Sequence, residues 1–227
     1  MGMNKTGARA GFSLMLSALQ KHRTDVLTRN SAQKSQAARK PEPSRHVSGR
    51  VRALFPIAEV FRRYGYEAAT MSILAQETGL GRSSLYHYFP GGKEEMALAV
   101  LDLAEVFLRE DLMARLGGDG DPSLRVEHFL GRLKEYYCGG AVGCVFASLT
   151  LHDCPPPVAT RVSALMHFWI KELAGRLTKL GVKSPTTVAA SVIRNVQGGL
   201  VVALATQDGG HFDAALQDLR PLLLPSS

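Results

Sequence analysis

The amino-acid sequence predicts an all-α fold. Apolar residues recur at intervals of three and four along nearly the whole chain after residue 49, which is the spacing of one helix face. Glycine and proline clusters interrupt this pattern, and the alternation of apolar and polar residues that marks a strand does not occur. With 227 residues, of which 45% are hydrophobic, the chain can bury the core of one large domain or two small ones.

Charge and composition divide the chain into a basic leader over residues 1–48, a short domain over 49–92 and a larger domain over 93–224. Residues 1–50 hold ten Lys and Arg and two acidic residues, a net charge of +8, whereas the remainder of the chain carries −1. The overall charge of +7 is therefore mostly a property of the leader. It is weak evidence for nucleic-acid binding by the folded part.

The leader has three interpretations. It is low in aromatic and acidic residues, which favours a disordered tail. A basic arm that adds salt-sensitive affinity for DNA is the second interpretation. The third is a targeting segment, because residues 12–19 are apolar and follow Lys5 and Arg9, but a small-x-small cleavage site is missing. We favour the disordered tail.

The first helix of the short domain is predicted over residues 51–65. Pro56 lies within it and removes one backbone donor, so the helix either starts near Phe55 or begins earlier and bends. Its apolar stripe consists of Val51, Leu54, Phe55, Ala58 and Phe61.

Two short helices joined by a glycine turn follow. Thr70 is a suitable N-cap for a helix that reaches Thr78, and Gly79 suits a helix end that needs a positive φ. Leu80 can fill the angle between the two helices. This arrangement is a helix-turn-helix, a motif that places its second helix in the major groove of DNA.

The second short helix spans residues 82–88 and has an inner and an outer side. Leu85 and Phe89, four residues apart, face inward. Hydrogen-bond donors and flat apolar surfaces on the outer side suit base edges, thymine methyls and phosphates. An exposed polar helix without a ligand is the alternative interpretation. The outer side carries Arg82, Ser83, Ser84, Tyr86 and His87.

Lys93 lies in the first turn of the next long helix, where a cation opposes the helix dipole. A phosphate held at this helix end by the ammonium and by free backbone amides would explain the lysine. The Gly-Gly-Lys sequence is not a P-loop, because His87 stands where that motif needs glycine and Glu94 where it needs Ser or Thr. We therefore predict a contact of Lys93 with the DNA backbone.

Residues 70–93 resemble the DNA-reading half of TetR/AcrR-type transcriptional repressors. The stretch Gly-Leu-Gly-Arg-Ser-Ser-Leu-Tyr-His-Tyr-Phe-Pro-Gly-Gly-Lys-Glu-Glu-Met is similar to the LmrA/YxaF-like branch of that family. Most relatives have two residues between the phenylalanine and the lysine, but Pro90, Gly91 and Gly92 make three here. The strong resemblance covers residues 50–101.

The resemblance implies a set of DNA contacts. Side chains on the outer side of the second short helix face bases or their flanking sugars, and Ser72 on the preceding helix joins them. Thr70, Tyr88 and Lys93 hold phosphates. The complete set is Thr70, Ser72, Arg82, Ser83, Ser84, Tyr86, His87, Tyr88 and Lys93.

The larger domain is predicted to be helical throughout, with Ser123 and Ser184 as N-caps of two of its helices. The predicted helices cover residues 93–116, 123–137, 144–152, 158–180, 185–206 and 211–224. The resemblance implies that the last two long helices pair with their symmetry mates in a homodimer. The monomer's own core is the alternative partner for their apolar face. That face contains Val188, Val192, Val196, Gly198, Gly199, Leu200, Ala203 and Leu204.

The resemblance also implies a pocket for a small-molecule effector among the middle helices. Such pockets are mostly apolar and carry a few placed polar groups. A position in the ordinary core is the alternative for each candidate. The candidates are Phe107, Phe129, Tyr136, Phe146, His152, Met166, Trp169 and Asn195.

The sequence contains no catalytic, zinc-spaced or dinucleotide-binding motif, so we expect neither an enzyme nor a cofactor or metal. Its three cysteines form no Cys-x-x-Cys pair, which argues against a disulfide framework and for a reducing cytoplasm. A thiol sensor at Cys138 and Cys144 is a weaker interpretation than inert cysteine in a helical core. No apolar run reaches the roughly 18 residues that span a bilayer.

Together these observations predict a cytoplasmic, homodimeric transcriptional repressor. We expect it to bind a palindromic, double-stranded DNA operator and to be released by a small hydrophobic effector. Two alternatives remain at this stage. One is an enzyme or small-molecule carrier with a vestigial helix-turn-helix, and the other is a DNA-binding protein that has no effector.

Overall fold

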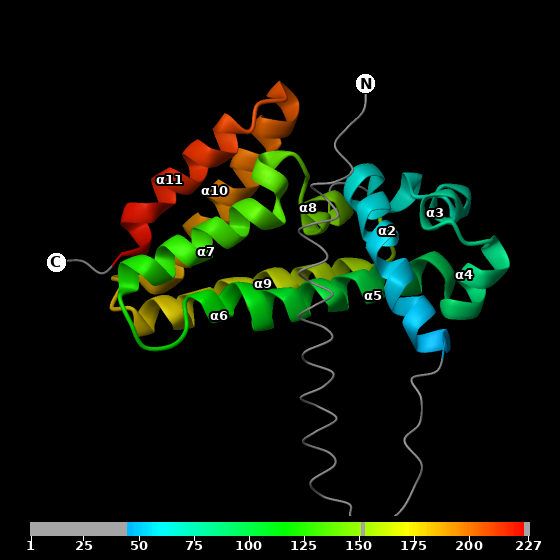
Figure 1. Ribbon diagram of the computed structural model, residues 1–227, viewed down its shortest axis with the longest axis horizontal. Coiled ribbons are helices and arrows are strands. Elements are labelled where there is room, and N and C mark those ends of the chain that lie inside the picture. Colours follow the sequence, from blue (N-terminus) through cyan, green and yellow to red (C-terminus); the bar gives the residue numbers. More distant parts are fainter. Residues whose placement is uncertain (1–44, 151–152, 225–227) are drawn as a thin grey trace, which may run out of the picture.

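The structure is a computed structural model that describes residues 45–150 and 153–224. All regular secondary structure in this part of the chain is helical, so the predicted fold class is confirmed. Figure 1 shows α2, α3 and α4 gathered at one end of the molecule and the long helices extending away from them. Residues 1–44 of the leader lie outside the described part, as does His152.

The short domain and the first long helical run consist of α2 (Arg45–Ala68), α3 (Met71–Thr78), α4 (Arg82–Tyr88), α5 (Gly92–Phe107), a π-helical turn (Leu108–Leu112) and α6 (Met113–Arg115). The remainder consists of α7 (Pro122–Tyr136), a 3₁₀ turn (Cys138–Gly140), α8 (Val145–Thr150), α9 (Pro156–Lys179), α10 (Pro185–Thr206) and α11 (Gly210–Leu223).

Helix α2 begins well before Pro56, which decides between the two predicted starts. Gly65, with φ 71° and ψ −170°, is the residue at which its backbone departs from helical geometry. Ile57 and Phe61 are fully buried on its inner face. Packing of this stripe offsets the cost of about 3 kcal/mol that a proline imposes inside a helix.

The predicted helix over residues 93–116 is present, but it is not uniform. A π-helical turn at Leu108–Leu112 separates α5 from α6. Asp111 in this turn is buried and pairs with Arg132 of α7, with an oxygen–nitrogen distance of 2.6 Å. The sequence pattern did not predict this turn, because the apolar spacing on either side of it remains helical.

The two N-caps predicted for the larger domain have different outcomes. Helix α7 begins at Pro122, and the Asp121 carboxylate, not Ser123, caps it by accepting a hydrogen bond of 2.9 Å from the Ser123 backbone N–H. Because Pro122 occupies the first helical position, the cap lies two residues before the predicted Ser123. Ser184 is the N-cap residue of α10 and Pro185 follows it, as predicted, but with φ 53° the Ser184 backbone is left-handed, and its hydroxyl forms no capping bond with the described residues.

Helix α10 packs between α9 and α11. This position corrects the predicted dimer face, because Val192, Val196 and Leu200 are buried inside the monomer itself. Gly198 and Leu204 of the predicted face remain exposed, and α10 also exposes Val201 and Val202, which are 59% and 43% exposed. By length and composition alone, α10 is also the one helix of the described residues that could cross a membrane.

Candidate nucleic-acid interface

The turn between α3 and α4 is built by local side-chain chemistry. The Thr70 hydroxyl accepts a hydrogen bond of 3.3 Å from the Ile73 backbone N–H and caps α3, as predicted. Gly79 ends α3 with φ 67°, a left-handed conformation that glycine adopts without strain. The Leu80 N–H donates to the Thr78 hydroxyl at 3.3 Å, which fixes the chain as it turns into α4.

Helix α4 has only seven residues, too few to be stable by itself, and is held by two anchors. Leu85 and Phe89 are both 0% exposed, which confirms their predicted inward direction. Burial of each such side chain is worth roughly 1.5–3 kcal/mol. Because these anchors fix the rotation of α4, the opposite side of the helix must face solvent.

The outer side of α4 is polar and open. Arg82, Ser83 and His87 are exposed and Tyr86 is 49% exposed, whereas Ser84 and Tyr88 are half-buried. The Arg82 guanidinium donates a hydrogen bond to the hydroxyl of exposed Ser72 on α3. The structure therefore brings the predicted residues of the two helices onto one surface.

Arg50 of α2 holds the far end of α4, which sequence reasoning missed. It donates hydrogen bonds to the Tyr88 carbonyl and, at 2.7 Å, to the Glu95 carboxylate, and it lies 4.4 Å from the Phe89 ring centroid. Glu95 also accepts a bond of 2.8 Å from the Gly91 N–H. Desolvation would raise the pKa of Glu95, but the bonds from Arg50 and Gly91 hold it below its ordinary value.

Tyr88 is packed against α2 and does not stand free on the surface. A Cβ atom at Gly49 would lie 2.3 Å from the Tyr88 hydroxyl, so a larger residue there would have to displace the Tyr88 side chain. No local sequence signal links Gly49 or Arg50 to Tyr88, because the contact joins residues almost forty positions apart.

Lys93 is half-buried, and its ammonium already has partners. It donates to the Tyr66 carbonyl at 3.0 Å and to the Glu67 carbonyl at 3.3 Å, and it lies 4.3 Å from the Tyr66 ring centroid. Desolvation lowers the pKa of Lys93, partly opposed by the Glu67 carboxylate. The cation in the first turn of α5 thus meets the carbonyl end of α2, a partner that the helix dipole favours.

Residues 57–100, which contain the later part of α2, all of α3 and α4 and the start of α5, match the family described as Bacterial regulatory proteins, tetR family. The protein belongs to the TetR family. The predicted resemblance is therefore confirmed, and the protein is a TetR-family transcriptional regulator.

Curated relatives extend the similarity beyond the helix-turn-helix. The HTH-type transcriptional regulator LmrA of Bacillus subtilis (strain 168) is 23% identical over 181 residues, covering 75% of this chain and 95% of LmrA. The uncharacterized HTH-type transcriptional regulator YxaF of the same strain is 22% identical over 167 residues, covering 70% of this chain and 86% of YxaF. Both relatives are HTH-type transcriptional regulators.

Solved structures share the fold along most of the chain. The TetR-family regulator SCO4454 from Streptomyces coelicolor has a TM-score of 0.66 at 19% identity, covering 78% of this chain and 95% of its own. A TetR-family regulator from Agrobacterium tumefaciens has a TM-score of 0.68 at 18% identity, covering 78% of this chain and 97% of its own.

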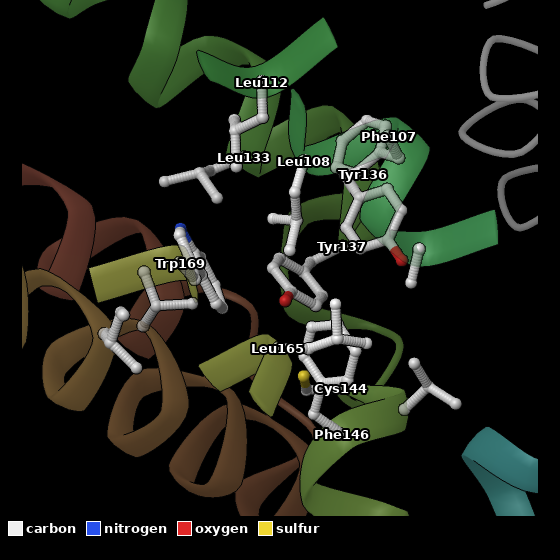
Figure 2. Close-up of a cluster of buried hydrophobic side chains, with 14 of the residues drawn as sticks. Phe107, Leu108, Leu112, Leu133, Tyr136, Tyr137, Cys144, Phe146, Leu165 and Trp169 are labelled. Carbon is white, nitrogen blue, oxygen red and sulfur yellow. The ribbon is translucent and has the colours of Figure 1, made fainter. Parts of the chain in front are cut away.

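The C-terminal part of this TetR-family protein contains a small cavity surrounded by aromatic and aliphatic side chains (Figure 2). Of the predicted effector contacts, Phe107, Tyr136, Phe146 and Trp169 line it. Sequence reasoning missed the other lining residues, because any buried side chain at helical spacing has the same pattern. They are Ala104, Leu108, Leu112, Leu133, Tyr137, Cys144 and Val145.

Three predicted effector contacts do not line this cavity. Phe129 is fully buried in the core, Met166 is half-buried, and the Asn195 amide donates a hydrogen bond of 3.0 Å to the Ser191 carbonyl of its own helix. For these three residues the structure agrees with the alternative interpretation, which is an ordinary structural position among the helices and not a place in the cavity wall.

The cavity leaves about 10 Å³ of free space, which is room for about one water molecule. The protein's own side chains therefore fill the place where the family resemblance implies a pocket. Trp169 is 1% exposed, and its indole N–H has no hydrogen-bond partner among the described residues. An unpaired buried donor is costly, so this N–H is available to an acceptor that enters the cavity.

The three cysteines are free thiols. Cys144 is buried in the cavity wall, while Cys138 and Cys154 are half-buried. Burial raises the pKa of Cys138 and of Cys154, which lowers their thiolate content. Within the described residues no three His, Cys, Asp or Glu side chains gather where they could hold a metal.

Proposed function

We propose that this TetR-family protein is a cytoplasmic, homodimeric repressor that binds a palindromic operator and is released by a small, largely hydrophobic effector. The observation that supports DNA reading most directly is the exposed polar side of α4, held outward by buried Leu85 and Phe89. On this proposal residues 49–92 read DNA, and residues 93–224 bind the effector and dimerise.

The proposed base contacts come from the outer side of α4. Arg82 suits a guanine edge, since its guanidinium can donate two hydrogen bonds to one base. Ser72 accepts a hydrogen bond from Arg82 and so limits the directions in which Arg82 can point. Tyr86 offers a flat apolar face to thymine methyls, and Ser83, Ser84 and His87 complete the surface that meets bases or sugars.

Phosphate contacts are proposed for Thr70, Tyr88 and Lys93 at the ends of the helices. The hydroxyl of Thr70 and the ammonium of Lys93 are each engaged in a helix-end contact. These contacts hold the Thr70 hydroxyl at the start of α3 and the Lys93 ammonium at the end of α2. Contacts of this kind position a protein on the duplex without selecting sequence.

The proposed dimer forms through α10 and α11. The exposed small and apolar side of α10 supports this, and we call it the α10 strip: Gly198, Val201, Val202 and Ala205. A two-fold dimer would present two copies of α4 to half-sites about one helical turn of DNA apart.

The closed cavity supports effector binding only if its wall moves. The unpaired Trp169 N–H favours a ligand that carries a hydrogen-bond acceptor on a mostly apolar body. The same closure favours a second candidate function, namely a DNA-binding regulator without an effector, because the free space already fits no more than about one water.

The proposal is tested by selecting duplexes from a random pool with the purified full chain and measuring their affinity by gel shift. We expect enrichment of a palindromic sequence. Arg82→Ala should weaken binding to this duplex by about 10- to 150-fold for each half-site, while leaving weak, non-specific binding nearly unchanged. Lys171→Ala, an exposed cation on α9, is the matched control and should bind like the wild type. Failure to enrich any duplex at low salt would refute DNA reading.

A further inference from the structure

A chain of stacked cationic and aromatic side chains crosses the interior and ends on α2. The Arg132 guanidinium lies 5.1 Å from the Phe107 ring centroid, and the Phe107 and Tyr136 rings stack with centroids 4.2 Å apart. Arg62 lies 5.1 Å from the Tyr136 ring centroid and donates a hydrogen bond of 2.9 Å to the Tyr136 hydroxyl. We call these four side chains the Arg–aromatic column.

Both ends of the column are held by carboxylates. Asp111 accepts bonds of 2.9 and 2.6 Å from Arg132, and Glu59 accepts a bond of 2.9 Å from Arg62. The side chains of Arg132 and Arg62 are only 3% and 6% exposed. Removing a partner from a buried charge is strongly destabilising, so these cations cannot leave their partners cheaply.

The middle of the column is part of the cavity wall. Phe107 and Tyr136 both line the cavity, and Figure 2 shows them on the opposite side of the cluster from Trp169. Since the cavity holds about 10 Å³, any ligand larger than one water must displace wall side chains. Displacing Tyr136 would carry away the hydroxyl that satisfies Arg62.

Arg62 connects this wall to the DNA-reading domain. It belongs to α2, whose other neighbours include α3 and α5, and its backbone carbonyl accepts a bond of 2.8 Å from the Ser148 hydroxyl of α8. Its Nε atom has no hydrogen-bond partner among the described residues. If the Tyr136 hydroxyl moves away, a second guanidinium nitrogen of Arg62 therefore loses the hydrogen bond that it donates to Tyr136.

We propose that Arg62 is a positioning residue that couples the cavity wall to the DNA-reading domain, so that displacement of Tyr136 shifts α2 and lowers operator affinity. This inference rests on the proposed function. It adds a connection from the cavity wall to the DNA-reading domain through the Tyr136–Arg62 hydrogen bond and α2, and this connection does not depend on movement of α5.

Overfilling the cavity with a side chain tests the coupling without an identified ligand. Ala104 is buried in the cavity wall, and Ala104→Leu adds more volume than the free space holds. We expect Ala104→Leu to weaken binding to the selected duplex about tenfold. In the Tyr136→Phe background, which keeps the ring and removes only the hydroxyl, the same substitution should change affinity less than about twofold.

The neighbouring Tyr137 provides the matched control. It also lines the cavity and is buried, so Tyr137→Phe removes a hydroxyl from the same wall without touching the Tyr136–Arg62 bond. The loss of about tenfold on Ala104→Leu should persist in the Tyr137→Phe background. An equal loss in the Tyr136→Phe background would overturn the proposal, because the effect would then bypass Arg62.

Hydrogen exchange separates this proposal from the proposed function. Ala104→Leu should speed amide exchange in the last turns of α2, and Tyr136→Phe should abolish that difference. If the wild type binds no duplex, DNA reading fails, and the exchange measurement still decides the coupling. If Ala104→Leu does not fold, Val145→Ile at the same cavity wall takes its place. Unchanged α2 exchange in a folded, overfilled variant would refute the coupling.

Discussion

The Lys93 ammonium donates a hydrogen bond to the Tyr66 carbonyl and stacks on the ring of the same residue, which ties the first turn of α5 to the end of α2. The bond explains why a cation is placed where its own helix dipole disfavours it. An ammonium has three N–H donors, and two are directed at the carbonyls of Tyr66 and Glu67. A phosphate can accept the third.

Lys93→Ala should therefore have two separate effects. Loss of the contact with the α2 carbonyls should lower the free energy of unfolding by about 1 kcal/mol, measured by thermal unfolding without DNA. Loss of a phosphate contact should reduce the salt dependence of log Kd by about 0.9 per protomer, which is about 1.8 for the dimer on its operator. Lys171→Ala serves as the control for both measurements. A lower Tm with an unchanged salt dependence would make Lys93 a helix-end contact and not a DNA contact.

Asp111 predicts an acid-sensitive contribution to stability. Desolvation would raise its pKa, but hydrogen bonds from Arg132 and Arg115 hold the pKa of this carboxyl below its ordinary value. A carboxylate with a depressed pKa stabilises the folded state above its unfolded pKa of about 3.9, and this contribution is lost as the pH falls through the folded-state pKa.

Asp111→Asn should thus destabilise the protein at neutral pH, by up to about 3 kcal/mol, since it leaves the buried Arg132 charge with only the exposed Glu135 as a carboxylate partner. The difference from the wild type should shrink as the pH falls below about 4. Thermal unfolding followed by circular dichroism at several pH values measures this. Asp102→Asn, at a carboxylate 66% exposed, is the control with little expected effect. A difference that stays constant down to pH 2 would contradict the assignment.

The helix-turn-helix was predictable from sequence because local chemistry determines it. The cap at Thr70, the left-handed Gly79 and the buried Leu85 each act within a few residues of their position. The contacts of Arg50 and Lys93 were not predictable, because they join residues 45 and 27 positions apart through the tertiary fold.

The outer side of α10 could not be assigned from its sequence pattern for a related reason. Val196 is 0% and Val201 59% exposed, although both are valines on one apolar helix. When the apolar face of a helix is wide enough to be covered by two neighbouring helices, its sequence does not indicate which of them belongs to the same chain. The effector candidates had the same ambiguity. Trp169 lines the cavity and Met166 does not, and only the three-dimensional structure shows this difference.

Gly199 controls the approach of α10 to α11. A Cβ atom there would lie 2.6 Å from the Ala215 Cβ, so Gly199→Ala must push the two helices apart. We expect a loss of about 1–3 kcal/mol in thermal unfolding. Gly131 in α7 is the control, since an added Cβ there meets no described heavy atom within 4 Å and alanine favours the helix by up to about 1 kcal/mol. Equal effects of the two substitutions would contradict the close packing of α10 on α11.

The α10 strip predicts the oligomeric state. Val201→Glu places a charge at the proposed two-fold interface, where it would be desolvated and close to its own symmetry copy, and should yield a monomer in size-exclusion chromatography with light scattering. Leu124→Glu on α7 is a matched control, because Leu124 is 58% exposed and Val201 59%. A charge on an exposed surface outside the interface should leave the dimer intact. Operator affinity should fall with Val201→Glu alone, since a monomer occupies one half-site. If Val201→Glu stayed dimeric at micromolar concentration, the dimer interface would have to lie on another face of the molecule.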